Sequence, residues 1–160
     1  MFYEHGVKFS CQRCSYCCSN GPGFVYLSRR DLEVLAEFYK ISPVEFVEKY
    51  CRWTDYYEGK IVLALQEAKN PVTKKLDCIL WNCGCSAYAA RPVQCSTYPF
   101  WDWMLNDKTL WNEVAQDCPG MNSGAQWTYE QIEDQKKLFT ENIPISIEEF
   151  DSVYNGRDEA

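Results

Sequence analysis

Apolar residues recur at helical spacing in several segments of the chain, and each of these segments opens with a side chain that can cap a helix. Ser28 and Asp31 form the pattern of a capping box before the first apolar segment. Ser42 at the cap, Pro43 at the first helical position and Glu45 closing a box predict the next start. Two consecutive helices are therefore predicted, the second carrying one face of Val44, Val47 and Cys51 and an adjacent face of Phe46 and Tyr50.

The rest of the chain carries two further helix-start signals, one strand pattern and several turn signals. Thr128 with Gln131 predicts a further helix, and Ser146 with Glu149 predicts a short helical start near the end of the sequence. The run KIVLALQ, residues 60–66, is typical of a short strand. Asn70-Pro71 breaks the pattern. Residues 77–120 are predicted as turns with one small helical piece at 86–90, residues 19–24 as a turn, and the tail NGRDEA as frayed.

These elements predict an α+β protein that is small, loop-rich and mainly helical, with one or two short strand pairs and with cysteine-ligated metal as a cross-link. The chain has the length of a single domain, 160 residues, and 46% of them are hydrophobic, so a packed core is expected rather than disorder. We expect one domain over residues 1–160, with its motif core at 9–124 and a helical extension at 125–154.

Charge and hydropathy limit the partners. The formal net charge is −7 and no long basic run occurs, which argues against nucleic acid as a partner because phosphate binding needs concentrated lysine and arginine. No apolar run is long enough to span a membrane, and no secretory signal is visible at the N-terminus. We therefore expect a cytoplasmic location; the sequence does not identify a protein partner.

The ten cysteines are the most informative residues. In a reducing cytosol, clustered cysteines hold metal or do redox work more often than they form structural disulfides. Cys11, Cys14 and Cys17 follow one another at two-residue intervals, so their thiolates can converge on one point, as in zinc knuckles and iron–sulfur loops. Cys18 adjoins Cys17 and is expected to face a second metal or to point outward.

Further cysteines follow at positions 78, 83, 85, 95 and 118, and Cys118-Pro119 resembles the Cys-Pro ending of bacterial ferredoxin motifs. Cys51 lies on a predicted apolar helix face and is interpreted as a buried thiol. Cys83 is ambiguous, because Cys83-Gly84-Cys85 is too tight for both thiolates to bind one zinc ion easily. The single histidine, His5, is interpreted as a solvated bystander.

Four runs of the sequence, taken in order, resemble those of a known protein family. The runs CQRCSYCC, GPGFVYLSRRDL, CILWNCGCSAYAARPVQCSTYPFW and CPGMNSG, from about Phe9 to Gly124, resemble the cysteine-cluster (CxxCxxCC) proteins, which are named for zinc or iron chelation; flagellin lysine-N-methylases carry a related cysteine domain. The resemblance implies eight metal ligands: Cys11, Cys14, Cys17, Cys18, Cys78, Cys85, Cys95 and Cys118. Ser15 and Ser96 depart from the pattern at positions where glycine and arginine are usual, and neither change removes a thiolate.

Eight thiolates can form two four-cysteine sites, and zinc and iron both remain open, with the spacing slightly favouring an iron–sulfur cluster. Eight thiolates around two divalent ions carry a net charge of about −4, so cations are needed nearby; the candidates are Arg13, Lys74, Lys75 and Arg91. We hypothesise that Arg13 or Arg91 donates to thiolate sulfurs or to a carboxylate beside them. The alternative is that Arg91 caps the short helix that Pro92 ends.

No phosphate loop, dinucleotide fingerprint or Ser/His/Asp arrangement accompanies the cysteines. Three functions stay open: a module that handles or senses zinc or iron, an iron–sulfur enzyme of methyl or electron transfer, and a protein-interaction module with structural zinc. The aromatic run YPFWDW, residues 98–103, could shield a cluster, but ordinary core packing explains it as well. A metal-binding role is the common element, and catalysis is the less favoured interpretation.

Overall fold

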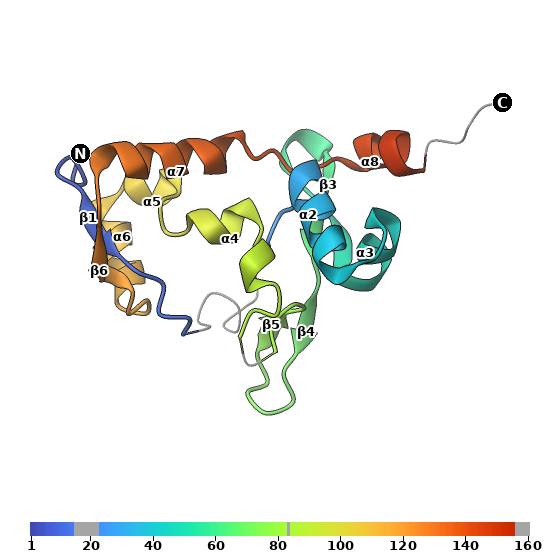
Figure 1. Cartoon of the computed structure of the whole chain (residues 1–160), viewed down its shortest axis with the longest axis horizontal. Helices are drawn as coiled ribbons and strands as arrows, with labels where there is room; N and C mark the ends of the chain where they lie inside the picture. The colour runs from blue at the N-terminus through green and yellow to red at the C-terminus, as the bar shows by residue number, and fades with distance from the viewer. Residues whose placement is uncertain (15–22, 83, 156–160) are drawn as a thin grey trace.

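The structure is a computed structural model of the chain, and it describes residues 1–14, 23–82 and 84–155. The molecule is elongated, with the N-terminus at one end and the last helix, α8, at the other (Figure 1). Seven α-helices lie in the described ranges: α2 (Arg29–Tyr39), α3 (Pro43–Tyr50), α4 (Val93–Thr97), α5 (Asp102–Leu105), α6 (Lys108–Ala115), α7 (Tyr129–Glu141) and α8 (Ile147–Tyr154). Two short 3-10 turns, η1 (Tyr57–Gly59) and η2 (Tyr88–Ala90), accompany them.

The four predicted helix starts are confirmed. Ser28 caps α2 and Thr128 caps α7, each in a complete capping box with the residue three positions later. Ser42 caps α3, with Pro43 in the first turn, and Ser146 caps α8. These are local interactions within four residues, so they hold wherever the helix packs.

The strands form three separate antiparallel pairs, one more than the sequence predicted. β1 (Val7–Phe9) pairs with β6 (Met121–Trp127), β2 (Cys51–Asp55) with β3 (Ile61–Leu65), and β4 (Glu67–Lys69) with β5 (Leu76–Cys78). β3 lies within the predicted 60–66 strand. The fold class is therefore α+β with small sheets, as predicted.

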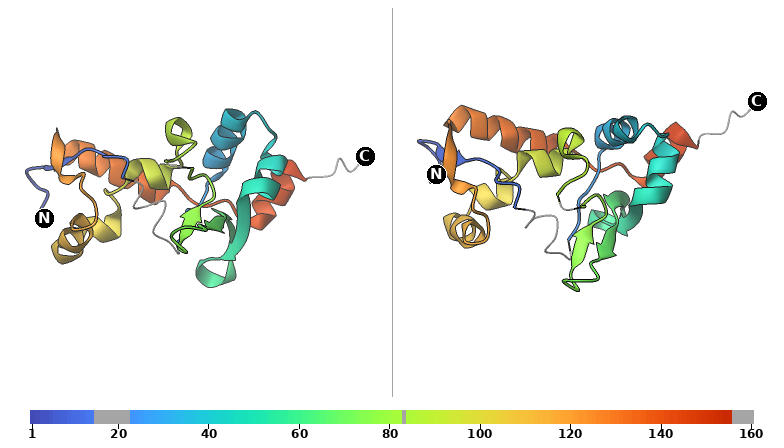
Figure 2. Two further views of the ribbon diagram at one scale, coloured as in Figure 1. Left: turned by 90° about the horizontal axis from the view of Figure 1, so that it is seen from below. Right: turned by 60° about the horizontal axis from the view of Figure 1, so that its bottom comes forward.

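Two hydrophobic cores organise the described residues. One is built on α2, α3 and the β2–β3 pair, and its members include Leu32, Phe46, Leu63 and Phe150. The other is built on the β1–β6 pair and α5–α7, with Tyr3, Phe100 and Trp111 at its centre. The β1–β6 pair and the start of α7 lie on one side of the molecule, α2, α3 and α8 lie on the other, and α4 lies between the two groups (Figures 1 and 2).

Two sequence predictions need correction. Cys51 does not continue the helical face of Val44 and Val47, because α3 ends at Tyr50 and Cys51 begins β2; Phe46 is the fully buried side chain of that helix. The segment predicted as turns also contains three helices, α4, α5 and α6, besides the predicted piece, which is η2. The predicted turn at 19–24 falls mostly on residues outside the described ranges.

Candidate metal centre

Six of the eight predicted ligands line one cavity of about 1820 Å³ between the two cores: Cys11, Cys14, Cys78, Cys85, Cys95 and Cys118. They come from segments up to 107 positions apart in the sequence, so the fold has gathered them. The other two predicted ligands, Cys17 and Cys18, lie outside the described residues, as does Cys83. The cavity is therefore the place where the predicted site must be sought.

The β1–β6 pair brings the segment that precedes Cys11 beside the segment that follows Cys118. Phe9 pairs with Met121 in this antiparallel ladder, and beyond it the Ser10 amide donates to the Gly120 carbonyl oxygen at 3.2 Å. Continuing the same register sets Cys11 opposite the segment of Cys118 and Pro119. The sheet thus joins the first cysteine of CQRCSYCC to the Cys-Pro motif.

Two glycines make this approach possible, and the sequence interpretation had given them no role. A Cβ on Gly120 would lie closer than 3.0 Å to the Ser10 carbonyl oxygen, and a Cβ on Gly124 would collide with the Ser10 side chain. Gly124 also has a φ of 82°, which favours glycine. The Ser10 hydroxyl in turn accepts a hydrogen bond from the Ala125 amide at 2.8 Å. The glycines of CPGMNSG therefore fit the backbone around Ser10, next to Cys11.

Cys78 and Cys85 lie at the other side of the cavity, at the edge of the first core. Cys78 ends β5 and pairs with Glu67, while Cys85 forms a bridge with Trp81. The turn between them is fixed by Ser86, whose amide donates to the Leu80 carbonyl at 2.9 Å. The Ser86 hydroxyl lies 2.8 Å from the hydroxyl of Tyr39 on α2, so this turn is tied to a core helix.

Cys95 lies on α4, which is held by hydrogen bonds from Val93 and Gln94, the two residues before Cys95. The Gln94 side chain accepts from the Tyr26 amide at 2.9 Å and donates to the Phe24 carbonyl at 2.7 Å. The Val93 amide donates to the buried Asp31 carboxylate at 3.0 Å. The same carboxylate accepts from the Asn142 side chain at 2.9 Å. Asp31 therefore caps α2 and also fixes the position of α4.

The donor set suits a soft metal. All seven described cysteines carry thiols, and no disulfide joins any two of them. Thiolates are the preferred ligands of zinc and iron–sulfur clusters rather than of magnesium or calcium. No three cysteine, histidine or carboxylate side chains within residues 1–14, 23–82 and 84–155 converge closely enough to hold one ion. The described thiols thus fit the chemistry of the predicted site and are gathered in one cavity, without a complete coordination sphere.

Two arginines enter the same cavity and share one aromatic ring. The guanidinium carbons of Arg13 and Arg91 lie 3.7 Å and 3.9 Å from the centroid of the Tyr88 ring. Arg91 also donates from Nε to the Tyr88 carbonyl at 3.0 Å, at the end of η2, which is the capping bond that the sequence offered as an alternative. The other candidate cations, Lys74 and Lys75, are exposed in the β4–β5 turn and do not line the cavity.

The sequence from residue 10 to residue 119 matches the CxxCxxCC family, described as "Putative zinc- or iron-chelating domain". The chain belongs to this family. The matched range contains every predicted ligand, so the cysteine-lined cavity is the structural setting of the family's motif. The family assignment supports zinc or iron chelation and leaves the choice between the two metals open.

A curated relative of this CxxCxxCC protein is the uncharacterized protein MJ0661 of Methanocaldococcus jannaschii. It is 26% identical over 127 residues, which cover 76% of this chain and 63% of the relative. The chain thus spans less than two thirds of the length of that relative. No solved structure matches the chain. No described helix is long and apolar enough to cross a membrane.

Cys51 is separated from the CxxCxxCC site. Its thiol is buried in the first core, only 6% exposed, and it does not line the cavity. Burial raises the pKa of this thiol well above its usual range, so Cys51 stays protonated at neutral pH. This matches the interpretation of Cys51 as a buried thiol. The single histidine, His5, is exposed in the N-terminal turn, and it too lies outside the cavity lining.

The aromatic run at 98–103 serves both interpretations made of it. Phe100 is buried in the second core and Tyr98, Trp101 and Trp103 line the cavity. The Trp101 indole donates to the Gln94 carbonyl at 3.0 Å and its ring stacks on Phe139 of α7. The run therefore packs one core and also forms a wall of the cysteine cavity.

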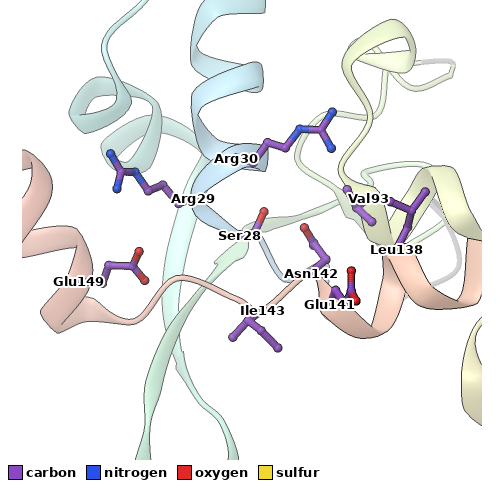
Figure 3. Close-up of a pocket in the computed structure, with 9 residues that line it drawn as sticks. All are labelled: Ser28, Arg29, Arg30, Val93, Leu138, Glu141, Asn142, Ile143 and Glu149. Atoms are coloured by element: carbon purple, nitrogen blue, oxygen red, sulfur yellow. The ribbon is translucent and has the colours of Figure 1, made fainter.

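A second, open pocket of about 390 Å³ lies at the start of α2 and is lined by mixed charges (Figure 3). Arg29 and Arg30 line it together with Glu141 and Glu149. Arg29 is already paired with Glu33 at 3.1 Å, and the α2 terminus is capped by Ser28. None of the predicted ligands is among the residues of this pocket.

Proposed function

We propose that this CxxCxxCC domain binds zinc or iron through the thiolates of Cys11, Cys14, Cys17, Cys18, Cys78, Cys85, Cys95 and Cys118. The observation that carries the proposal is the shared cavity: the six of these residues that the structure describes all line it, whereas Cys51 does not. Cys78, Cys85 and Cys118 also contact the two cores, so the cavity lining rather than burial is what separates these six residues from Cys51.

The proposed site has a structural role that follows from its position. Cys11 and Cys118 belong to the side of the β1–β6 pair, Cys78 and Cys85 to the side of α2 and β2–β3, and Cys95 to α4 between them. Bound zinc or iron would supply cross-links between these segments. Because the unfolded chain has no preformed site, the binding free energy becomes folding free energy, on the order of 10–16 kcal/mol for a structural zinc site.

The chain's own residues prepare this site in three ways. The β1–β6 ladder brings the segment before Cys11 beside the segment after Cys118, the Ser86 and Tyr39 hydroxyls fix the turn of Cys85, and Gln94 fixes α4 with Cys95. The aromatic side chains of Tyr98 and Trp101 also line the cavity. A closed four-cysteine site is structural rather than catalytic, so we propose a binding protein and not an enzyme.

The test is anaerobic purification followed by metal analysis, sulfide analysis and an absorption spectrum. Stoichiometric metal is expected, and Cys95→Ala and Cys118→Ala are expected to lose it, because each removes a ligand. Cys51→Ala is the matched control and should retain the full metal content. Metal-free wild-type protein, or full metal content in both ligand variants, would contradict the proposal.

The same preparation distinguishes the two metals. The spacing of Cys11, Cys14 and Cys17, with Cys118-Pro119, favours an iron–sulfur cluster, for which a coloured protein with acid-labile sulfide is expected. Colourless protein with stoichiometric zinc would overturn the preference for iron while leaving the metal-binding proposal intact.

A further inference from the structure

The cysteine cavity contains two positive charges that no described carboxylate neutralises. Arg13 and Arg91 are the basic residues among its described lining, and neither forms an ion pair within the described ranges. Arginine in proteins is always charged, and two guanidinium groups against one ring repel each other. An anion close to both groups would offset this repulsion.

The acidic residues that line the cavity do not supply that anion. Glu67 accepts from Arg52 at 3.0 Å and from the Gly23 amide at 2.8 Å, so it is already committed. Asp55 and Asp102 line the cavity without an ion pair to either arginine. The thiolates of the proposed site would be further anionic groups in this cavity, and Cys11 and Cys14 flank Arg13 in the sequence.

The two arginines are also positioned to donate hydrogen bonds to the cysteine sulfurs. Arg13 lies between Cys11 and Cys14, with a φ of 52°, and its amide already donates to the Cys11 sulfur at 3.4 Å. Arg91 donates from Nε to the Tyr88 carbonyl at 3.0 Å, and among the described residues its two Nη groups form no hydrogen bond, so they can donate to another acceptor. Tyr88 holds both groups in place, because its ring attracts each cation.

We propose that Arg13 and Arg91, held against the Tyr88 ring, are positioning residues that counterbalance the negative charge of the metal–thiolate centre. Their Nη groups donate to thiolate sulfurs, which disperses the net charge of about −4 expected for eight thiolates and two divalent ions. Groups of this kind around a metal site typically change metal affinity by about 10- to 100-fold. The inference rests on the proposed metal-binding function and adds residues that are not themselves ligands.

The test compares the rate of metal transfer to the chelator EDTA from anaerobically purified variants. Arg13→Met and Arg91→Met are each expected to release metal about 10-fold faster than wild type, and the double variant faster still. Arg30→Met is the matched control, because it removes the same charge from an exposed site outside the cavity and should release metal at the wild-type rate.

Two further measurements separate this electrostatic role from a merely structural one. The excess release rate should shrink as salt is raised, since screening weakens the charge effect, and Arg91→Lys should restore part of the retention. Tyr88→Phe keeps the ring and should behave like wild type, whereas Tyr88→Leu should release metal faster. Circular dichroism of each variant checks that it is folded.

The outcomes distinguish the two proposals. Wild-type protein without metal would overturn the metal-binding function itself. Wild-type protein with metal, together with wild-type release rates in both arginine variants and in Tyr88→Leu, would overturn only the role of the arginines. If Arg30→Met released metal as fast as Arg13→Met and Arg91→Met, the role of the two arginines would also be overturned. The release rate would then depend on the net charge of the protein and not on the positions of these arginines.

Discussion

Ser10 and Gly120 touch through their backbones: the Ser10 amide donates to the Gly120 carbonyl at 3.2 Å, and a Cβ on Gly120 would have to occupy the space of the Ser10 carbonyl oxygen. This contact joins two segments 110 positions apart, one ending at Cys11 and the other beginning at Cys118. The close approach of the two backbones thus determines how near these cysteines can lie.

Gly120→Ala is expected to separate these segments. Because the added methyl group meets backbone rather than a movable side chain, we expect a loss of about 1–3 kcal/mol in the free energy of unfolding and faster metal release. Urea unfolding of the metal-loaded protein measures the first effect. Gly23→Ala is the control, since a Cβ there meets nothing within 4 Å, and it should change stability by less than about 0.5 kcal/mol. Equal effects of the two substitutions would refute the steric explanation.

Tyr39→Phe should loosen the turn that carries Cys85. It removes the hydroxyl that lies 2.8 Å from Ser86, and the loss of one such hydrogen bond costs about 1 kcal/mol. Thermal unfolding and the rate of metal loss to a chelator are the measurements. Tyr50, whose ring packs 5.2 Å from that of Tyr39, forms no hydrogen bond through its hydroxyl among the described residues. Tyr50→Phe should therefore resemble wild type, and a larger effect there than at Tyr39 would contradict the prediction.

Asp31→Ala is expected to be among the most destabilising single substitutions. The buried carboxylate accepts from the amides of Ser28 and Val93 and from the Asn142 side chain, so its removal leaves one buried and two half-buried donors without this acceptor. We expect a loss of about 3 kcal/mol or more in urea unfolding. Asp107→Ala removes the cap of α6, which is exposed, and should cost only about 1 kcal/mol. If Asp31→Ala lowers the free energy of unfolding by no more than Asp107→Ala does, the hydrogen bond between Asp31 and α4 contributes little to stability.

The burial of the Cys51 thiol leads us to predict that the stability of the protein falls at high pH. Burial raises the pKa of its thiol in the folded protein, whereas the same thiol in the unfolded chain ionises near pH 8.5. The unfolded state therefore loses a proton that the folded state keeps, and stability falls above about pH 8.5 by about 1.4 kcal/mol per pH unit. Denaturant unfolding of wild type and Cys51→Ala between pH 7 and pH 10 measures the difference. Parallel curves for the two proteins would refute the prediction.

The sequence was most informative where structure depends on neighbouring residues. Ser28, Ser42, Thr128 and Ser146 begin helices where predicted, because a cap acts within one turn. The family resemblance, rather than spacing alone, implied the set of cysteines of which the six described members line the cavity. The buried position of Cys51 was also expected, although the element that carries it is a strand.

Elements that depend on distant partners could not be predicted. The strands of the β4–β5 pair, EAK and LDC, lack a regular apolar alternation, and the pair is supported by a contact from outside it, Arg52 to Glu67. Helices α4 and α5 have only five and four residues, too few for a periodic pattern. The second role of Asp31, holding α4, was invisible because its partner Val93 lies 62 residues away.

The pairing of β1 with β6 has a consequence for the order in which the protein is made. Strand β1 leaves the ribosome first, but its partner begins at Met121, and the other core needs Ile145 and Phe150. At roughly 5–20 residues per second, Cys11 and Cys14 wait on the order of ten seconds before Cys118 exists. If the proposed ligand set is right, the complete site cannot form until Cys118 has been made, and metal that binds earlier would have an incomplete set of ligands.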